Sequence, residues 1–143
     1  MTIASNDPDE ALYTINLTGN GEPVPVPDIN VQVALVDYAS GSMYDFGSVM
    51  LGNSGLAITF TIENLGTAPL SLTLPMSLGG LNPTDFILIG PASNSVAVGA
   101  SETFTLTFTP GDTGAREALL TIVSDDPDEA NYEINLMGTC TPV

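Results

Sequence analysis

Basic residues are almost absent from this sequence. It contains no lysine or histidine and a single arginine, Arg116, against 17 aspartate and glutamate residues, which gives a net charge of −16. Nucleic-acid binding depends on lysine and arginine contacts to phosphate, and anionic membrane surfaces attract basic clusters, so we expect neither partner. The hydrophobic content of 43% argues against disorder, which combines high charge with low hydrophobicity. A folded domain with an acidic surface is therefore expected.

The same absences remove most catalytic sites. Without histidine or lysine, a serine or cysteine nucleophile has no partner base of the usual kind. One cysteine and no histidine are too few ligands for a structural zinc site. A pair of carboxylates could hydrolyse a glycoside, but the acidic residues are dispersed along the chain. The sequence also has no tryptophan, and its four tyrosines and five phenylalanines are few for an aromatic platform that binds a sugar. We predict that the chain is not an enzyme and requires no cofactor.

The single cysteine excludes a disulfide bond within the chain, and the short apolar runs argue against a membrane-spanning helix. Cys140 has no internal disulfide partner, and we expect it to lie in a linker where the fold does not need its side chain; an intermolecular bridge is the alternative. No apolar run approaches the roughly 18 residues of a membrane-spanning helix. The first residues lack the basic and apolar regions of a signal peptide. We therefore expect no membrane insertion by this segment.

What the sequence does contain is an internal repeat. Residues 2–19, TIASNDPDEALYTINLTG, return as residues 121–138, TIVSDDPDEANYEINLMG, at an offset of 119 residues and with 13 of 18 positions identical. This period exceeds the roughly 20–50 residues of a solenoid repeat and is close to the roughly 100 residues of an immunoglobulin-like sandwich. We therefore expect each repeat to be a domain that folds by itself.

The repeat predicts the domain boundaries. Residues 28–139 should form one complete sandwich, and residues 1–20 should be the closing hairpin of a preceding repeat. The segment 21–27, GEPVPVP, should be a stiff linker, because alternating proline favours polyproline II. Residues 140–143 should begin the next linker.

Apolar residues alternate with polar ones along several segments, with a period of two. This pattern is typical of antiparallel strands with one face on a core, and no stretch indicates a helix of useful length. Further strands are expected at 29–38, 48–51, 70–74, 86–89 and 95–98. The predicted core shared by two sheets consists of Ile58, Phe60, Ile62, Phe104, Leu106, Phe108, Leu120, Ile122, Ile134 and Leu136.

Glycines mark the turns and close contacts of the predicted sandwich. In the segment Asn64-Leu65-Gly66-Thr67, Asn64 and Gly66 suit the left-handed positions of a tight turn. Gly47, which follows a core phenylalanine, should leave room for a close backbone approach. Both are predictions about folding rather than about a site.

Several motifs occur in an order that resembles a known family. They are Phe46-Gly47-Ser48-Val49, Phe60 to Leu70 (FTIENLGTAPL), Phe104 to Pro110 (FTLTFTP) and the closing SDDPDE segment. Together they resemble the bacterial choice-of-anchor D repeat, a relative of the Hydin-type (ASH) immunoglobulin-like domains. The resemblance implies an all-β, immunoglobulin-like antiparallel sandwich of seven to nine strands, found in arrays in secreted or surface-anchored bacterial proteins. It supplies no catalytic site.

The resemblance therefore implies an extracellular or cell-surface location and a structural role as a spacer or stalk in a multi-repeat protein or fibre. Neighbouring repeats or copies of the chain would be its partners. The alternative is an adhesion module that binds a surface glycan or protein through loops at one end of the sandwich. A binding module should carry long loops with clustered aromatic residues, which the sequence does not show.

One acidic cluster is a candidate calcium site. Asp125, Asp126, Asp128 and Glu129 place four carboxylates within five residues, and the earlier copy repeats three of them as Asp7, Asp9 and Glu10. Calcium takes six to eight oxygen ligands, and such a loop offers several. The spacing differs from an EF-hand, and acidic turns are common, so a solvated turn is the competing interpretation.

The duplicated hairpin is a candidate self-association surface. Its apolar residues correspond to residues of the second copy, in the pairs Ile3 with Ile122, Tyr13 with Tyr132, Ile15 with Ile134 and Leu17 with Leu136. The chain contains only one complete sandwich, with one place for a closing hairpin, and the C-terminal copy should occupy that place. The N-terminal hairpin then lies on its own sandwich, remains disordered, or pairs with another chain in a head-to-tail contact that can run on as a fibre.

Overall fold

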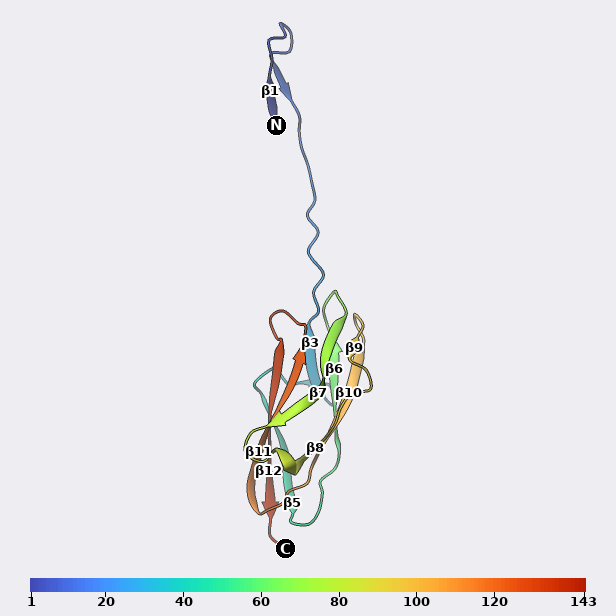
Figure 1. Ribbon diagram of the computed structural model, residues 1–143, viewed down its shortest axis with the longest axis vertical. Coiled ribbons are helices and arrows are strands. Elements are labelled where there is room, and N and C mark those ends of the chain that lie inside the picture. Colours follow the sequence, from blue (N-terminus) through green and yellow to red (C-terminus); the bar gives the residue numbers. More distant parts are fainter.

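The computed structural model describes residues 1–143 as a β-sandwich with a separate small hairpin. The hairpin consists of β1 (Thr2–Ala4) and β2 (Leu12–Thr14) and lies beyond the sandwich at the end of an extended segment (Figure 1). The termini of the sandwich lie at opposite ends of its long axis (Figure 1). The structure has no helix with the length and apolar character that crossing a membrane requires.

Two five-stranded sheets form the sandwich. The first has the order β4 (Val36–Asp37), β3 (Ile29–Val33), β6 (Ile58–Asn64), β10 (Ser101–Phe108) and β8 (Phe86–Ile89). The second has the order β5 (Met43–Met50), β12 (Asn131–Thr141), β11 (Gly114–Ser124), β7 (Leu70–Gly79) and β9 (Ser95–Val96). A single 3-10 turn, η1 (Pro83–Asp85), precedes β8.

The predicted all-β, immunoglobulin-like sandwich is confirmed. Two of the ten sandwich strands, β4 and β9, are two residues long, and the remaining eight fall within the predicted range of seven to nine. All strand neighbours are antiparallel except β5, which runs parallel to the last strand, β12.

The alternating pattern also located the core correctly. Nine of the ten predicted core side chains are no more than 1% exposed, and Ile58 is partly buried. Phe60 and Phe104 are cross-strand partners whose rings stack 5.0 Å apart. Burying side chains of this size contributes about 1.5–3 kcal/mol each, so this face of β6 and β10 is a principal source of stability.

Several predicted strand boundaries differ from the structure. The strand expected over 29–38 breaks where Ala34 and Leu35 adopt φ values of 50° and 66°, which turn the chain back into β4. The strand expected from residue 48 begins at Met43, because β5 joins the edge of the second sheet beside β12. The strand expected over 70–74 continues to Gly79, where it pairs with β11.

The linker expected at residues 140–143 was placed too early. Strand β12 continues to Thr141, whose carbonyl accepts a hydrogen bond from Leu51 N–H at 2.9 Å. Cys140 is 2% exposed and pairs with Gly114 on one side and with Val49 on the other. The expectation that its side chain lies in a linker was therefore wrong, because the edge strand β5 holds the end of β12 in the sheet.

Two glycines have the opposite roles to those predicted. Gly66 is not in the left-handed region, but a Cβ there would lie 2.4 Å from the carbonyl oxygen of Val26. Gly47 has φ of 73° and open space around the position of a Cβ. Close approach thus selects glycine at position 66, and backbone conformation selects it at position 47.

Candidate functional site

The acidic turn between β11 and β12 is fastened to the start of the domain by Asp126. This side chain is 1% exposed, and its Oδ2 accepts a hydrogen bond from Ile29 N–H at 2.8 Å. Its Oδ1 accepts bonds from the N–H groups of Asp128 and Glu129, at 3.1 and 3.2 Å. Burial alone would raise the pKa of Asp126, but these backbone donors outweigh it, so the pKa lies below its ordinary value of 3.8.

The four carboxylates predicted as a calcium site do not all converge. Asp125 Oδ1 instead accepts a hydrogen bond from Ser71 N–H at 2.7 Å. The structure brings Asp126 and Glu129 together with Asp28, with one oxygen of each lying within 4.8 Å of the others. Asp28 was missed because it lies far from the turn in sequence.

The titration of this cluster follows from its crowding. A hydrogen bond with Asp126, and then that residue's charge, raises the pKa of Asp128. Burial, followed by the charges of Asp126 and Asp128, raises the pKa of Glu129. One converging oxygen from each of three carboxylates is fewer than the six to eight oxygens that calcium takes, and both oxygens of Asp126 already accept backbone hydrogen bonds. Calcium binding here stays a prediction.

The earlier copy keeps the local turn without the domain contact. Asp7, which corresponds to Asp126, accepts a hydrogen bond from Asp9 N–H at 3.3 Å, and the bonds with Asp9 lower the pKa of Asp7. Both residues and Glu10 are exposed. The hairpin has no counterpart of Ile29 to occupy the second oxygen, so its carboxylates lie in solvent.

The predicted self-association residues are exposed, unlike their counterparts. Ile3, Tyr13, Ile15 and Leu17 are 36–73% exposed, whereas the matching residues of the second copy are at most 2% exposed: Ile122, Tyr132, Ile134 and Leu136. Within a single chain the first hairpin thus presents an apolar face without a partner. Its pairing with another molecule is untested and stays a prediction.

Asn64 is a second buried polar group, and its side chain bonds to backbone groups beside the point where the linker enters the sandwich. Its side chain is fully buried and donates to the carbonyls of Ala68 at 2.8 Å and Val96 at 3.0 Å. Its Oδ1 accepts from Gly66 N–H at 3.0 Å and from Asp28 N–H at 3.4 Å. The sequence signalled a turn at this asparagine but not this bridge between four backbone groups.

The loop that Asn64 shapes fixes the chain entering the sandwich. The carbonyl of Val26 accepts hydrogen bonds from the N–H groups of Thr67 and Ala68 at 2.7 and 3.1 Å, and Val26 N–H donates to Thr67 Oγ1 at 3.2 Å. The predicted linker 21–27 is therefore bound to the domain from Val26 onward. Only its earlier residues lack such bonds.

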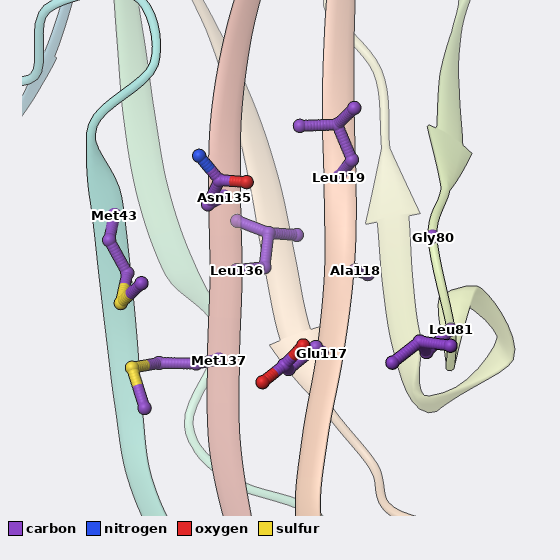
Figure 2. Close-up of a pocket in the computed structure, with 9 residues that line it drawn as sticks. All are labelled: Met43, Gly80, Leu81, Glu117, Ala118, Leu119, Asn135, Leu136 and Met137. Carbon is purple, nitrogen blue, oxygen red and sulfur yellow. The ribbon is translucent and has the colours of Figure 1, made fainter.

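A shallow apolar groove of about 230 Å³ lies on the outer face of the second sheet. Figure 2 shows Met43 on β5, Met137 on β12 and Glu117 on β11 around it, with Leu81 from the loop after β7 at its far side. Met43 and Leu81 are 58% and 79% exposed. The sequence did not indicate this groove, because its residues come from four separate segments.

Three further groups that could carry chemistry, Arg116, Tyr132 and Tyr44, make structural contacts. The guanidinium of Arg116 is paired with the carboxylate of Asp85, and this hydrogen bond raises the pKa of Arg116. Tyr132 is buried and donates its hydroxyl hydrogen to the carbonyl of Tyr38 at 2.6 Å. Tyr44 packs edge-on against Phe60 at 5.1 Å. These aromatic rings belong to the core or its margin and do not form an exposed platform.

No family model matches this sequence, and no curated protein matches it. Among solved structures, a protein of unknown function from Porphyromonas gingivalis is similar at 20% identity and a TM-score of 0.56, over 80% of this chain and 46% of that one. The secreted serine protease VesC from Vibrio cholerae is similar at 21% identity and a TM-score of 0.53, over 67% of this chain and 21% of VesC.

An ASH/PapD-like domain of human CEP192 aligns over 92% of this chain and 97% of that domain, with 14% identity and a TM-score of 0.49. This chain spans less than half of the length of the P. gingivalis protein and about a fifth of VesC. At these identities the likeness to the two bacterial structures concerns the fold alone, an immunoglobulin-like sandwich that occurs as one part of longer proteins.

Proposed function

We propose that this chain is a non-enzymatic structural repeat of the choice-of-anchor D and ASH type, a spacer in a secreted or surface-anchored bacterial protein. The observation that carries the proposal is the placement of the chain ends. The linker enters at one end of the sandwich, β12 leaves at the opposite end (Figure 1), and the sequence begins to repeat with a period of 119 residues. Repeats joined in this way extend along one axis.

The hairpin of residues 2–19 fits this role as the closing hairpin of a preceding repeat. Its apolar side chains match those that β11 and β12 bury in the complete sandwich. In this isolated chain the same face can take up a neighbouring molecule head-to-tail, through Ile3, Tyr13, Ile15 and Leu17. Such a contact would reproduce the contact of the hairpin with its own domain in the array.

An adhesion module is the second candidate, and the outer groove is the observation that favours it. Met43, Met137 and Leu81 offer apolar surface that a peptide or an acyl group could cover. The other copy of this segment has Thr18 where β12 has Met137. The Met137 side of the groove is therefore not kept in both copies of this segment, which counts against the groove as the role of the repeat.

Chains of increasing length test the spacer role. Val143 corresponds to Val24 at the 119-residue offset. A two-repeat chain can therefore be made by joining residues 25–143 directly after residues 1–143, and a three-repeat chain by adding residues 25–143 once more. The largest dimension in small-angle X-ray scattering should increase by a constant step with each added repeat. Side-by-side packing, in which the width rises instead of the length, would contradict the proposal.

A binding screen separates the two candidates. The 143-residue chain should show no saturable binding on arrays of glycans and extracellular proteins. Binding that is saturable and that Met137→Thr abolishes would favour the adhesion module. The control is Val98→Thr, which changes an exposed side chain at the other end of the sandwich.

A further inference from the structure

The two copies of the closing segment together define how much free chain separates consecutive repeats. The last residue bonded into the sandwich is Thr141, which corresponds to Glu22 at the 119-residue offset. The first residue bonded into the next sandwich is Val26. Only Pro23, Val24 and Pro25 lie between them, and in the later copy the segment begins with the same residues, as Pro142 and Val143.

This linker is too short and too stiff to let two sandwiches move independently. Polyproline II rises about 3.1 Å per residue, so the four steps from the last bonded residue to the first span roughly 12 Å. Proline fixes φ at two of the three free positions. The facing ends of consecutive sandwiches must therefore lie close enough for the loops beside the linker to meet.

Both of these ends carry exposed apolar side chains. Beside the exit of β12, Leu56 in the loop between β5 and β6 is 84% exposed, and Met50 at the end of β5 is 47% exposed. They border a hollow of about 460 Å³ whose floor includes Phe108. Beside the entry of the linker, Leu65 and Val98 are 62% and 52% exposed. Such residues lie in solvent in a single domain but are suited to a contact between domains.

We propose that consecutive repeats form a fixed end-to-end joint, in which the Asn64–Ala68 loop of one repeat packs Leu65 against the hollow around Leu56 of the repeat before it. The occupant of the hollow is a second copy of this fold, because the tether delivers that copy and no other partner to this end. The hydrogen bonds of Asn64 and Val26 hold the loop in place. The inference rests on the proposed spacer function and adds that the spacer is a rod rather than a flexible chain of domains.

Rotational tumbling of the two-repeat chain, measured by 15N relaxation, tests the joint. Tumbling time scales with the volume of the rigid body, so both repeats should share one tumbling time at least double that of a single sandwich. Insertion of six Gly/Ser residues between Val143 and the following Pro25 should lower this tumbling time towards the value for a single sandwich, because the two repeats would then move independently. Equal tumbling times with and without the insertion would overturn the joint.

Point substitutions test the contact itself. Leu56→Asp in the first repeat and Leu65→Asp in the second should each shorten the shared tumbling time towards that of the chain with the insertion. Ile89→Asp is the matched control, since Ile89 is 65% exposed on β8 away from the joint, and it should change nothing. Each substitution is first made in the 143-residue chain, where unchanged far-UV circular dichroism shows that the sandwich folds.

The outcomes separate this inference from the function on which it rests. If the substitutions at positions 56 and 65 leave tumbling unchanged, the proposed contact is wrong. If the two repeats tumble independently while scattering still shows a constant increase in length, the spacer function stands and only the joint is lost. If the chain does not lengthen with added repeats, both proposals fail.

Discussion

Replacing Asn64 with alanine should remove much of the stability of the sandwich. The side chain makes three hydrogen bonds of 3.0 Å or less, to Ala68, Val96 and Gly66, and a longer one with Asp28. A buried backbone group that loses its partner costs about 1–3 kcal/mol, and some of these groups regain water at the domain end. We therefore expect a loss of about 3–4 kcal/mol, out of the 5–15 kcal/mol typical of a domain.

Urea unfolding of the 143-residue chain, followed by circular dichroism, measures this loss as a shift of the midpoint at constant slope. Asn53→Ala is the matched control, because Asn53 is exposed and its side chain makes no hydrogen bond; it should change stability by less than about 0.5 kcal/mol. Asn64→Asp keeps the acceptor but sets a carboxylate oxygen against the carbonyls of Ala68 and Val96, so it should be at least as damaging as alanine. A loss below about 1 kcal/mol for Asn64→Ala would refute the bridging role.

Three further outcomes are expected. Gly138→Ala should destabilise by about 1–3 kcal/mol in the same urea assay, because its Cβ would lie 2.6 Å from the ring of Phe108, which Phe86 packs against; wild-type stability would show that the ring can move. Because folding lowers the pKa of Asp126 below its ordinary value of 3.8, this carboxylate stabilises the fold at pH values above 3.8, and the stabilisation is lost as the pH falls through the folded-state pKa. Asp126→Asn should therefore reduce the loss of stability between neutral and acidic pH. An unchanged loss would assign the acid sensitivity to other carboxylates. If the acidic cluster binds calcium, millimolar calcium should raise the melting temperature above that in sodium chloride of matched ionic strength, and coincident melting curves would leave only screening of the −16 charge.

The core was predictable because it depends on a local pattern. Alternation along β6, β10, β11 and β12 assigns each side chain to a face, and the faces of Phe104 and Phe108 follow directly from it. The acidic turn was also visible, since it needs only Asp126 and the two backbone donors that follow within three residues. Both features have a short sequence range, so the pattern showed where they lie, although it did not show that Asp126 is buried.

The remaining features depend on contacts between distant segments. Asp126 meets Ile29, 97 residues away, and Asn64 meets Val96, 32 residues away. Cys140 is buried because an edge strand pairs with it, and nothing near it in the sequence indicates that pairing. Likewise, a glycine in a sequence does not reveal whether conformation or space selects it, which is why the roles of Gly47 and Gly66 were exchanged.

The two hairpins are nearly the same sequence in two settings, so amide hydrogen exchange within one chain tests most directly whether residues 2–19 lack the domain that completes them. In dilute solution, the amides of Ile122 and Ile134 should exchange only when the whole sandwich unfolds, because their strands are central to the second sheet. The amides of Ile3 and Ile15 should exchange nearly as fast as in an unstructured peptide, since an isolated hairpin is marginal in water. Equal protection of both hairpins at a concentration where the chain is monomeric would contradict this result and place the first hairpin on its own sandwich.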